Sequence, residues 1–386
     1  MKKRYRIRAL DTFRGISITF MILGHSAQFL LSEKDRWVGT SIFILGDALG
    51  AAAFILLAGI GLAFSFNSQN RKVLEDPKYT KKHSIIHFWT RTLWILGIAL
   101  IANLIGSAII WEMTIWVWYV LFAIAIARIV CYPFLKTSPY FRLIIGLLFI
   151  LLADTLRILL YTESTSSLFY ILFNDVSSIT PFPFFGFFFI GSAIGTWLIE
   201  SKSEEIGSPY SSNKFNSKNL IIIGISLIVL GILIGSYLSN DFMARKLMYD
   251  LNFHKDLTLY YLPRVLVRGS TSWSILSLGI ELILLAVLLQ RDIQTSEEKL
   301  IQISERPPRG LILFGQYSFT IYLCHYLLFI IFPKNLSIPF YIISFILIFF
   351  IIHSVMWLWV NRWHAYGTIE WLIKITTLHF QEKVQT

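Results

Sequence analysis

Residues 338–361 read IPFYIISFILIFFIIHSVMWLWVN, a stretch without a single Asp, Glu, Lys or Arg. A helix needs about 20 mostly apolar residues to cross the hydrocarbon core of a bilayer. The stretch is long enough and apolar enough to meet that condition. It therefore predicts a membrane-spanning helix, and it sets the fold class for the rest of the chain.

The composition extends this prediction to the whole chain. Of its 386 residues, 55% are apolar and only 15% are charged, with a mean hydropathy of +0.64. A soluble globular protein carries about 25% charged residues, so this chain has too little polar surface to cover a water-facing fold. Its 22 Gly, 11 Pro and 2 Cys also exclude collagen-like, disordered and disulfide-scaffold classes.

Ten apolar runs, separated by clusters of charged or turn-forming residues, have the length of a span. The predicted fold is therefore all-α: a polytopic integral membrane protein with about ten transmembrane helices. The runs are 12–31, 41–66, 88–110, 112–133, 141–161, 181–200, 219–238, 270–291, 311–332 and 338–361.

The chain end differs in character from the spans. After the last run, Trp363, Ile369, Leu372 and Ile373 alternate with polar residues at helical spacing. This pattern predicts an amphipathic helix lying at the membrane surface. We therefore expect a single transmembrane domain over 1–361, followed by a cytoplasmic amphipathic helix and tail over 362–386.

The distribution of basic residues predicts the orientation. With the N-terminus in the cytoplasm, 20 of the 34 Lys and Arg fall in cytoplasmic segments, eight in outer ones and six within the runs. Cytoplasmic loops carry the excess of Lys and Arg, so both termini are expected in the cytoplasm of a cell-membrane protein. The net charge of +11 then needs no nucleic acid, and no metal-ligand spacing or phosphate-binding loop occurs.

Ionisable residues inside spans are costly and are candidates for function. Arg14 and His25 lie 11 residues apart, so they share one face of a helix with about 16 Å between them. The candidates expected nearer the outer side are His25, Asp47, the i,i+3 pair Asp154 and Arg157, and His325. Those expected nearer the inner side are Arg14, Arg91 and Arg128.

Each candidate also has a structural interpretation. The arginines can anchor helices at the membrane interface, and Asp154 with Arg157 can form a structural ion pair. Glu281 and His353, also within spans, are compatible with either a structural or a functional role.

Several stretches resemble the transmembrane acyltransferase superfamily, in the branch that includes heparan-α-glucosaminide N-acetyltransferase and its prokaryotic relatives. The first carries an Arg, ten residues and then a His within LDTFRGISITFMILGH at 10–25. The others are FILLAGIGLAFSF at 54–66, PFFGFFFIGSAIGTWL at 183–198, LVRGSTSWSILSLGIEL at 266–282 and FGQYSFTIYLCHYLLF at 314–329.

The resemblance implies acyl transfer across the membrane, from cytoplasmic acetyl-CoA to an extracytoplasmic glycan or glycolipid. His25 takes the family's catalytic role as general base, with Asp47 or Asp154 orienting it and His325 assisting or replacing it. Cationic groups at the inner side, namely Arg14, Arg91 and Arg128, would hold the phosphates of the acyl donor. Whether the acyl group passes through a histidine intermediate stays open.

The resemblance has one departure. In the lysosomal branch the position of His25 is an Asn and the catalytic His lies in the first outer loop, where this chain has Lys34, Asp35, Arg36 and Trp37. The acceptor used by the lysosomal branch can therefore not be assigned to this chain. The expected partners are acyl-CoA, the acceptor, membrane lipids and a second copy of the chain, with no metal. The alternatives are a solute transporter or flippase that uses the buried charges, and a non-catalytic scaffold.

Overall fold

The computed structural model describes residues 7–109, 118–159, 179–203, 217–240, 244–245, 248, 251, 260–293 and 308–383. The chain divides into two compact units. The first unit comprises 1–54, 207–268 and 272–366, and the second comprises 55–206, 269–271 and 367–386. Each unit is described by itself.

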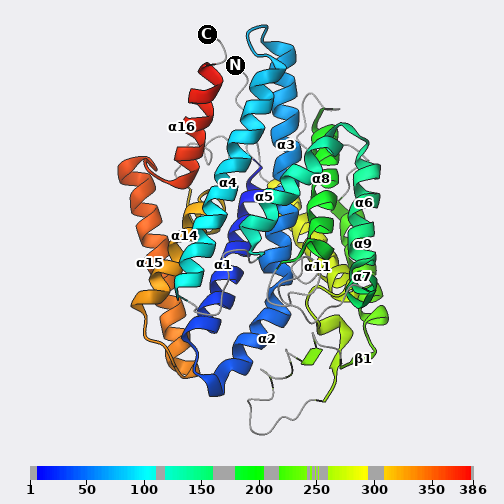
Figure 1. Cartoon of the computed structure of the whole chain (residues 1–386), viewed down its shortest axis with the longest axis vertical. Coiled ribbons are helices and arrows are strands. Elements are labelled where there is room, and N and C mark those ends of the chain that lie inside the picture. Colours follow the sequence, from blue (N-terminus) through cyan, green and yellow to red (C-terminus); the bar gives the residue numbers. More distant parts are fainter. Residues whose placement is uncertain are drawn as a thin grey trace. The chain divides into compact units, whose positions relative to one another are not determined.

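Helices dominate the first unit (Figure 1). Its helices are α1 (Arg8–Leu30), α2 (Arg36–Gly46), a π-helical turn (Ala48–Ala52), α9 (Ser217–Ile234), α11 (Thr271–Ile293, from its second residue), α13 (Gly310–Gln316), α14 (Ser318–Ile331) and α15 (Ile338–Trp363). Short 3-10 helices cover Glu33–Asp35 and Arg264–Leu266. The strands β1 (Leu238–Ser239) and β2 (Leu262–Pro263) pair antiparallel, with Leu238 opposite Pro263.

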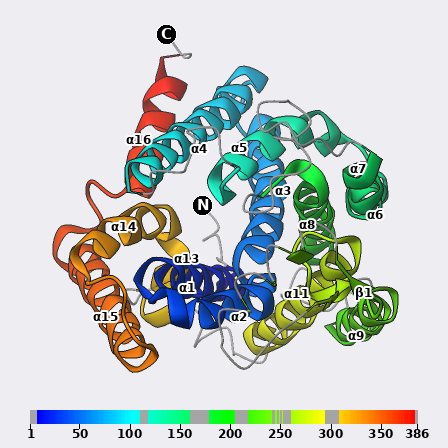
Figure 2. The same cartoon turned by 60° about the horizontal axis from the view of Figure 1, so that its bottom comes forward.

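Helix α1 packs most extensively against α13, as Figure 2 also shows. Two glycines make this close approach possible. A Cβ added to Gly15 would collide with the backbone carbonyl of Leu311, and one added to Gly315 would collide with that of Asp11. Helix backbones meet at such distances only where no side chain separates them. The first turn of α1 is completed by Asp292, whose carboxylate accepts a hydrogen bond from the Ala9 amide at 2.6 Å.

The region 311–332, expected as one straight span, is instead two helices. Helices α13 and α14 meet at an angle of 97°. Tyr317 between them has φ −114° and ψ 33°, outside the helical region. The bend turns α14 so that it also packs against α1, and it therefore brings residues some 300 positions apart in the sequence together.

The second unit contains the remaining helices. They are α3 (Ala53–Glu75, from Ile55), α4 (Lys81–Ile109), α5 (Val120–Cys131), a 3-10 helix (Tyr132–Lys136), α6 (Pro139–Leu151), α7 (Ala153–Leu159), α8 (Pro181–Ser203) and α16 (Ile369–Glu382). The expected span 141–161 is thus interrupted at Leu152, between α6 and α7. The stretch 112–117 of the expected fourth span, and the end of the fifth at 160–161, lie outside the described residues.

Helix α8 lies at the centre of the second unit. Its Gly191 approaches the carbonyl of Leu56 on α3, and Gly59 of α3 approaches the carbonyl of Phe188. On its other side α8 packs against α6, where the buried Arg142 donates hydrogen bonds to the Ser192 carbonyl at 2.9 Å and to Thr196 Oγ1 at 2.8 Å. These bonds offset part of the cost of burying the guanidinium, although its Nε has no hydrogen-bond partner among the described residues.

The expected C-terminal helix is present as α16, which begins at Ile369, while α15 continues to Trp363. It lies alongside α4. Trp94 Nε1 donates to Thr376 Oγ1 at 2.7 Å, and Gln381 Nε2 donates to the His83 carbonyl at 3.2 Å. The two helices are therefore antiparallel. The domain boundary at 361/362 and the surface position of this helix stay predictions.

Among the described residues, six helices are long and apolar enough to cross a membrane, and the bent pair α13–α14 would be a seventh if it is one span. Helix α1, which carries Arg14, His25 and Gln28, is not one of the six. The chain is a helical membrane protein, but the expected number of about ten spans is not confirmed.

Candidate functional site

Two histidines from opposite ends of the chain meet in the first unit. His25 lies on α1 and His325 on α14, with 3.0 Å between Nδ1 of His25 and Nε2 of His325. The rings are nearly parallel, at an interplanar angle of 11°. His325 is completely buried, whereas His25 is partly exposed. We call these two residues the histidine pair.

A backbone carbonyl determines how the protons are arranged in the histidine pair. His325 Nδ1 lies 3.3 Å from the Ile321 carbonyl one turn earlier. A carbonyl only accepts, so this nitrogen carries the proton and Nε2 of a neutral His325 is an acceptor. His25 then donates from Nδ1. In a neutral His25, Nε2 is left with its lone pair.

Aromatic rings enclose the histidine pair. Tyr326 packs on both rings, with centroid distances of 5.3 Å to His25 and 4.1 Å to His325. Phe43 lies 6.4 Å from the His25 ring, and Phe329 meets His325 edge-on at 5.3 Å. Such packing restricts the rotamers of both imidazoles.

Asp47 forms an ion pair with Arg268. Arg268 Nε donates to Asp47 Oδ2 at 2.5 Å, with both side chains largely buried. Asp47 sits where α2 gives way to the π-helical turn, a local distortion that often marks functional sites. Arg268 in turn lies within electrostatic range of His25.

Glu281 adds a second buried carboxyl to this region. It is fully buried on α11 and within electrostatic range of Asp47. Among the described residues, neither of its oxygens has a hydrogen-bond partner, and the same holds for the hydroxyl of Ser277 one turn earlier. Buried polar groups without partners are uncommon and call for an explanation.

Arg14 lies apart from the histidine pair along α1. Its Nη1 is 3.4 Å from Asp11 Oδ1, one turn earlier on the same helix, and the Gln316 amide also reaches the Asp11 carboxylate at 3.5 Å. Since α1 is one continuous helix from Arg8 to Leu30, about 16 Å separates Arg14 and His25 along the axis. The expected arrangement on one helix is therefore present, without direct contact.

Asp154, in the second unit, accepts a hydrogen bond from the amide of Thr271 at 3.0 Å, and Thr271 Oγ1 donates to the Ile150 carbonyl at 3.0 Å. Thr271 is the first residue of α11, so Asp154 stabilises the start of that helix. Arg157 lies on α7, but its side chain is outside the described part, and the expected pair cannot be placed.

The second unit gathers four basic side chains. His87 of α4 lies within electrostatic range of Lys72, Arg91 and Arg128. Arg128 is buried on α5, where Nε donates to Thr92 Oγ1 at 3.2 Å and the guanidinium lies 5.4 Å from the centre of the Phe88 ring. We call Lys72, His87, Arg91 and Arg128 the cationic cluster. Clefts lined by one sign of charge concentrate counter-ions, so this cluster favours a polyanion.

Sequence reasoning identified His25, His325, Arg91 and Arg128 but missed several neighbours. Arg268 lies in the segment 239–269, between two predicted spans, and it was therefore not among the ionisable residues expected inside a span. Of that segment, Lys246, His254 and Lys255 lie outside the described residues. His87, one residue before the predicted start of a span, gave no signal of its own. In the described part of the chain, no three metal-ligating side chains converge.

Taken together, the helices define a multi-pass membrane protein with an imidazole pair in one unit and a cationic cluster in the other. Residues 6–240 match the family model described as heparan-alpha-glucosaminide N-acetyltransferase, catalytic, and the chain belongs to this family. No curated protein and no solved structure matches it.

The match confirms the family resemblance drawn from the sequence and supports an acetyltransferase-like membrane function. It covers α1 to α9, which includes His25, Asp47 and the cationic cluster. Arg268, Glu281 and His325 lie beyond it.

Proposed function

We propose that the chain is a membrane acetyltransferase that uses acetyl-CoA and acylates an extracytoplasmic glycan or glycolipid, with His25 as general base. The observation that carries the proposal is the hydrogen-bonded series from the Ile321 carbonyl through His325 to His25. It orients one imidazole nitrogen, His25 Nε2, as a proton acceptor. A partly exposed base held by a buried partner is the arrangement that general-base catalysis needs.

The reaction requires a base that accepts a proton from the attacking group and an acid that donates a proton to the leaving group. His25 Nε2 removes the proton from the acceptor's hydroxyl or amine as that atom attacks the thioester carbonyl. The carbon–sulfur bond then breaks, and the departing CoA sulfur takes the proton back from the imidazolium. His325 accepts the hydrogen bond from His25 Nδ1 throughout and keeps the reacting nitrogen in place. It acts as a positioning residue.

Asp47 and Arg268 supply the charges near this base. Their ion pair is buried, and Arg268 is within electrostatic range of His25. We propose that Arg268 stabilises the oxyanion that forms on the thioester carbonyl, while Asp47 holds the guanidinium in position. Asp154 and Arg157 stay candidate catalytic residues from the sequence, although Asp154 is engaged at the start of α11.

The cationic cluster is proposed to bind the phosphates of acetyl-CoA. CoA is polyanionic, and arginine is suited to bidentate contact with phosphate. Arg128 is held by Thr92 and Phe88, so its guanidinium loses little freedom on binding. Arg14 remains a separate candidate for the same role. Both termini are proposed to lie in the cytoplasm, as the distribution of Lys and Arg predicts.

The deciding experiment measures release of the CoA thiol from acetyl-CoA by purified protein in lipid nanodiscs. Sugars that offer either a free amine or hydroxyls alone serve as acceptors. We expect His25→Asn to lower kcat by about 10²–10⁴, the usual contribution of a general base. His353→Asn is the matched control, because His353 packs on Phe314 in the same unit and is given no chemical role. Unchanged turnover in a folded His25→Asn protein would contradict the proposal.

A rapid acid quench during the first turnover separates the two chemical routes. Direct transfer predicts that no radiolabelled acetyl group remains on the protein. A labelled protein that is lost in His25→Asn would instead indicate an acetyl-imidazole intermediate.

A further inference from the structure

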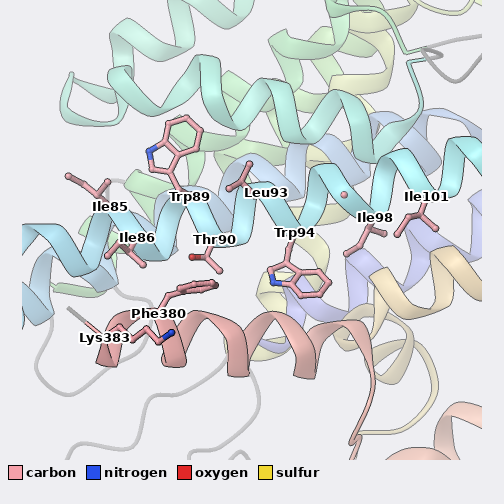
Figure 3. Close-up of a pocket in the computed structure, with 11 residues that line it drawn as sticks. Ile85, Ile86, Trp89, Thr90, Leu93, Trp94, Ile98, Ile101, Phe380 and Lys383 are labelled. Carbon is pink, nitrogen blue, oxygen red and sulfur yellow. The ribbon is translucent and has the colours of Figure 1, made fainter. Parts of the chain in front are cut away.

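An apolar groove runs between α4 and α16 in the second unit (Figure 3). Its volume is about 640 Å³, within the usual range of small-molecule sites. The floor and walls are aliphatic and aromatic side chains, among them Trp89, Leu93, Trp94, Ile101 and Phe380. Several of these stay exposed: Leu93 by 58%, Ile101 by 51% and Phe380 by 48%.

The groove follows α4 lengthwise. Its lining on α4 extends from Ile85 to Ile101, which corresponds to about 24 Å along a helix axis. The hydrocarbon core of a bilayer is about 30 Å thick, so each leaflet contributes about half of that. The groove is therefore long enough to hold an extended acyl chain over its whole depth in one leaflet.

One end of the groove is cationic. Lys383 lines it beside Phe380, and Figure 3 shows both on the side of α4 to which Ile86 and Thr90 point. Lys81 and Lys82 are exposed one helical turn before Ile85 and Ile86, on the same face of α4. These three lysines outnumber the neighbouring Glu382. The opposite end, at Ile98 and Ile101, is apolar.

An apolar channel that ends in lysines is complementary to one kind of molecule, an amphiphile with a long chain and an anionic head. Helix α4 is long and apolar enough to span the membrane, and only a third of its most apolar window is buried. The groove therefore opens where bilayer lipid is the surrounding solvent. We propose that it is a binding site for one anionic phospholipid, whose acyl chain lies along Leu93 and Trp94 and whose phosphate contacts Lys383, Lys81 and Lys82.

The site is separate from the chemistry proposed above, since none of its lining residues belongs to the histidine pair or the cationic cluster. Its occupant also joins α4 to α16. Two hydrogen bonds already join these helices: the bond from Trp94 to Thr376 lies at the groove, and the bond from Gln381 to the His83 carbonyl lies at its cationic end. A bound acyl chain would add apolar contacts between α4 and α16 along the groove.

The test is native mass spectrometry of the full chain, purified into detergent with phosphatidylglycerol or phosphatidylcholine added at matched concentrations. We expect one phosphatidylglycerol to be retained per chain, with a preference over phosphatidylcholine of about tenfold or more, as expected for charge-assisted contacts. The combined change Lys81→Gln, Lys82→Gln and Lys383→Gln should abolish this preference. Lys374→Gln, an exposed lysine elsewhere on α16, should leave it unchanged.

A second variant fills the groove itself. Gly97 lines it, and a Cβ at this position would meet nothing within 4 Å, so Gly97→Phe projects into open space without disturbing the packing. Both lipids should then lose most of their occupancy, whereas Val229→Phe on the exposed face of α9 should have no effect.

Equal retention of the two lipids by the wild-type chain would overturn the proposal. So would full occupancy in Gly97→Phe. Displacement of the bound phospholipid by added long-chain acyl-CoA would overturn it as well. That result would assign the groove to the donor substrate.

Discussion

The histidine pair and the cationic cluster hold their polar side chains in different ways. In the histidine pair each ring is oriented by a hydrogen bond, and the series ends on a backbone carbonyl. In the cationic cluster, His87, Lys72, Arg91 and Arg128 are brought within electrostatic range by the packing of α3, α4 and α5. The first arrangement determines which ring nitrogen carries a proton and orients it, whereas the second creates an electrostatic field. Catalysis needs the former and capture of a polyanion needs the latter.

The largest effect expected in the second unit is on donor binding. Arg128→Gln removes a buried guanidinium and should raise KM for acetyl-CoA by about 10- to 100-fold, as one or two charge-assisted contacts are lost. The value of kcat should change little. Steady-state kinetics at two salt concentrations measure this, and Arg142→Lys, which alters a buried arginine bonded to α8, controls for loss of packing. A fall in kcat at constant KM would remove the distinction between the two regions.

A change between α1 and α13 should disturb the histidine pair and leave the cationic cluster intact. In Gly315→Ala the new methyl group meets the Asp11 carbonyl, and such overpacking costs about 1–3 kcal/mol. We expect a lower thermal unfolding temperature together with a reduced kcat, while donor KM is retained. Gly97→Ala, where the added methyl group is unopposed, is the matched glycine control. A parallel loss of donor affinity would show that the two regions are coupled.

Two substitutions of His325 distinguish a positioning role from a packing role. In His325→Gln the amide oxygen can still accept a hydrogen bond from His25 Nδ1. The leucine side chain of His325→Leu has no acceptor. We expect kcat to fall by about tenfold more in the leucine variant, which corresponds to one hydrogen bond of roughly 1.4 kcal/mol. The pH–rate profile should keep its shape in the glutamine variant only. Equal losses in both variants would leave His325 with a structural role.

The smallest effect concerns α16. Tyr79 accepts a hydrogen bond from Gln381 at 2.6 Å and donates one to Gln69, so Tyr79→Phe should cost about 1 kcal/mol. Faster amide exchange in α16 measures it, and the exposed Tyr140 supplies the control variant Tyr140→Phe.

The same contact depends on pH. Burial raises the pKa of Tyr79, so above about pH 10 the unfolded state loses the phenol proton first and the folded state around Tyr79 loses stability as pH rises. Exchange in α16 that does not change with pH in this range would contradict this.

Composition and hydropathy were sufficient to predict a helical membrane protein, because both depend on residue type alone. The family was also recognisable from short stretches such as 10–25. The number of helices could not be predicted in the same way. The pair α13–α14 bends at Tyr317 and the pair α6–α7 breaks at Leu152, and neither residue is a turn former. Both interruptions fall inside continuous apolar runs, so hydropathy does not record them.

The site was predictable residue by residue but not as a geometry. His25 and His325 each stood out as imidazoles inside apolar runs, yet their contact spans 300 positions and depends on the bend at Tyr317. Arg268 was hidden by its loop, and Asp154 was expected beside Arg157 but bonds the start of α11. The roles of all these residues, and assembly into a homodimer, stay predictions.

The π-helical turn at Ala48–Ala52 has a consequence for the lineage of the chain. A π-turn is one residue longer than the α-turn it replaces, and here it has the sequence Ala-Leu-Gly-Ala-Ala. Deleting a single alanine would regularise the helix, but it would rotate everything on one side of the cut by about 100° relative to the other. Asp47 could then no longer face Arg268 while Ala52 and Ala53 kept their present neighbours. Among related sequences, insertions and deletions should therefore be rarer at these five positions than in exposed loops. The extra residue should be kept.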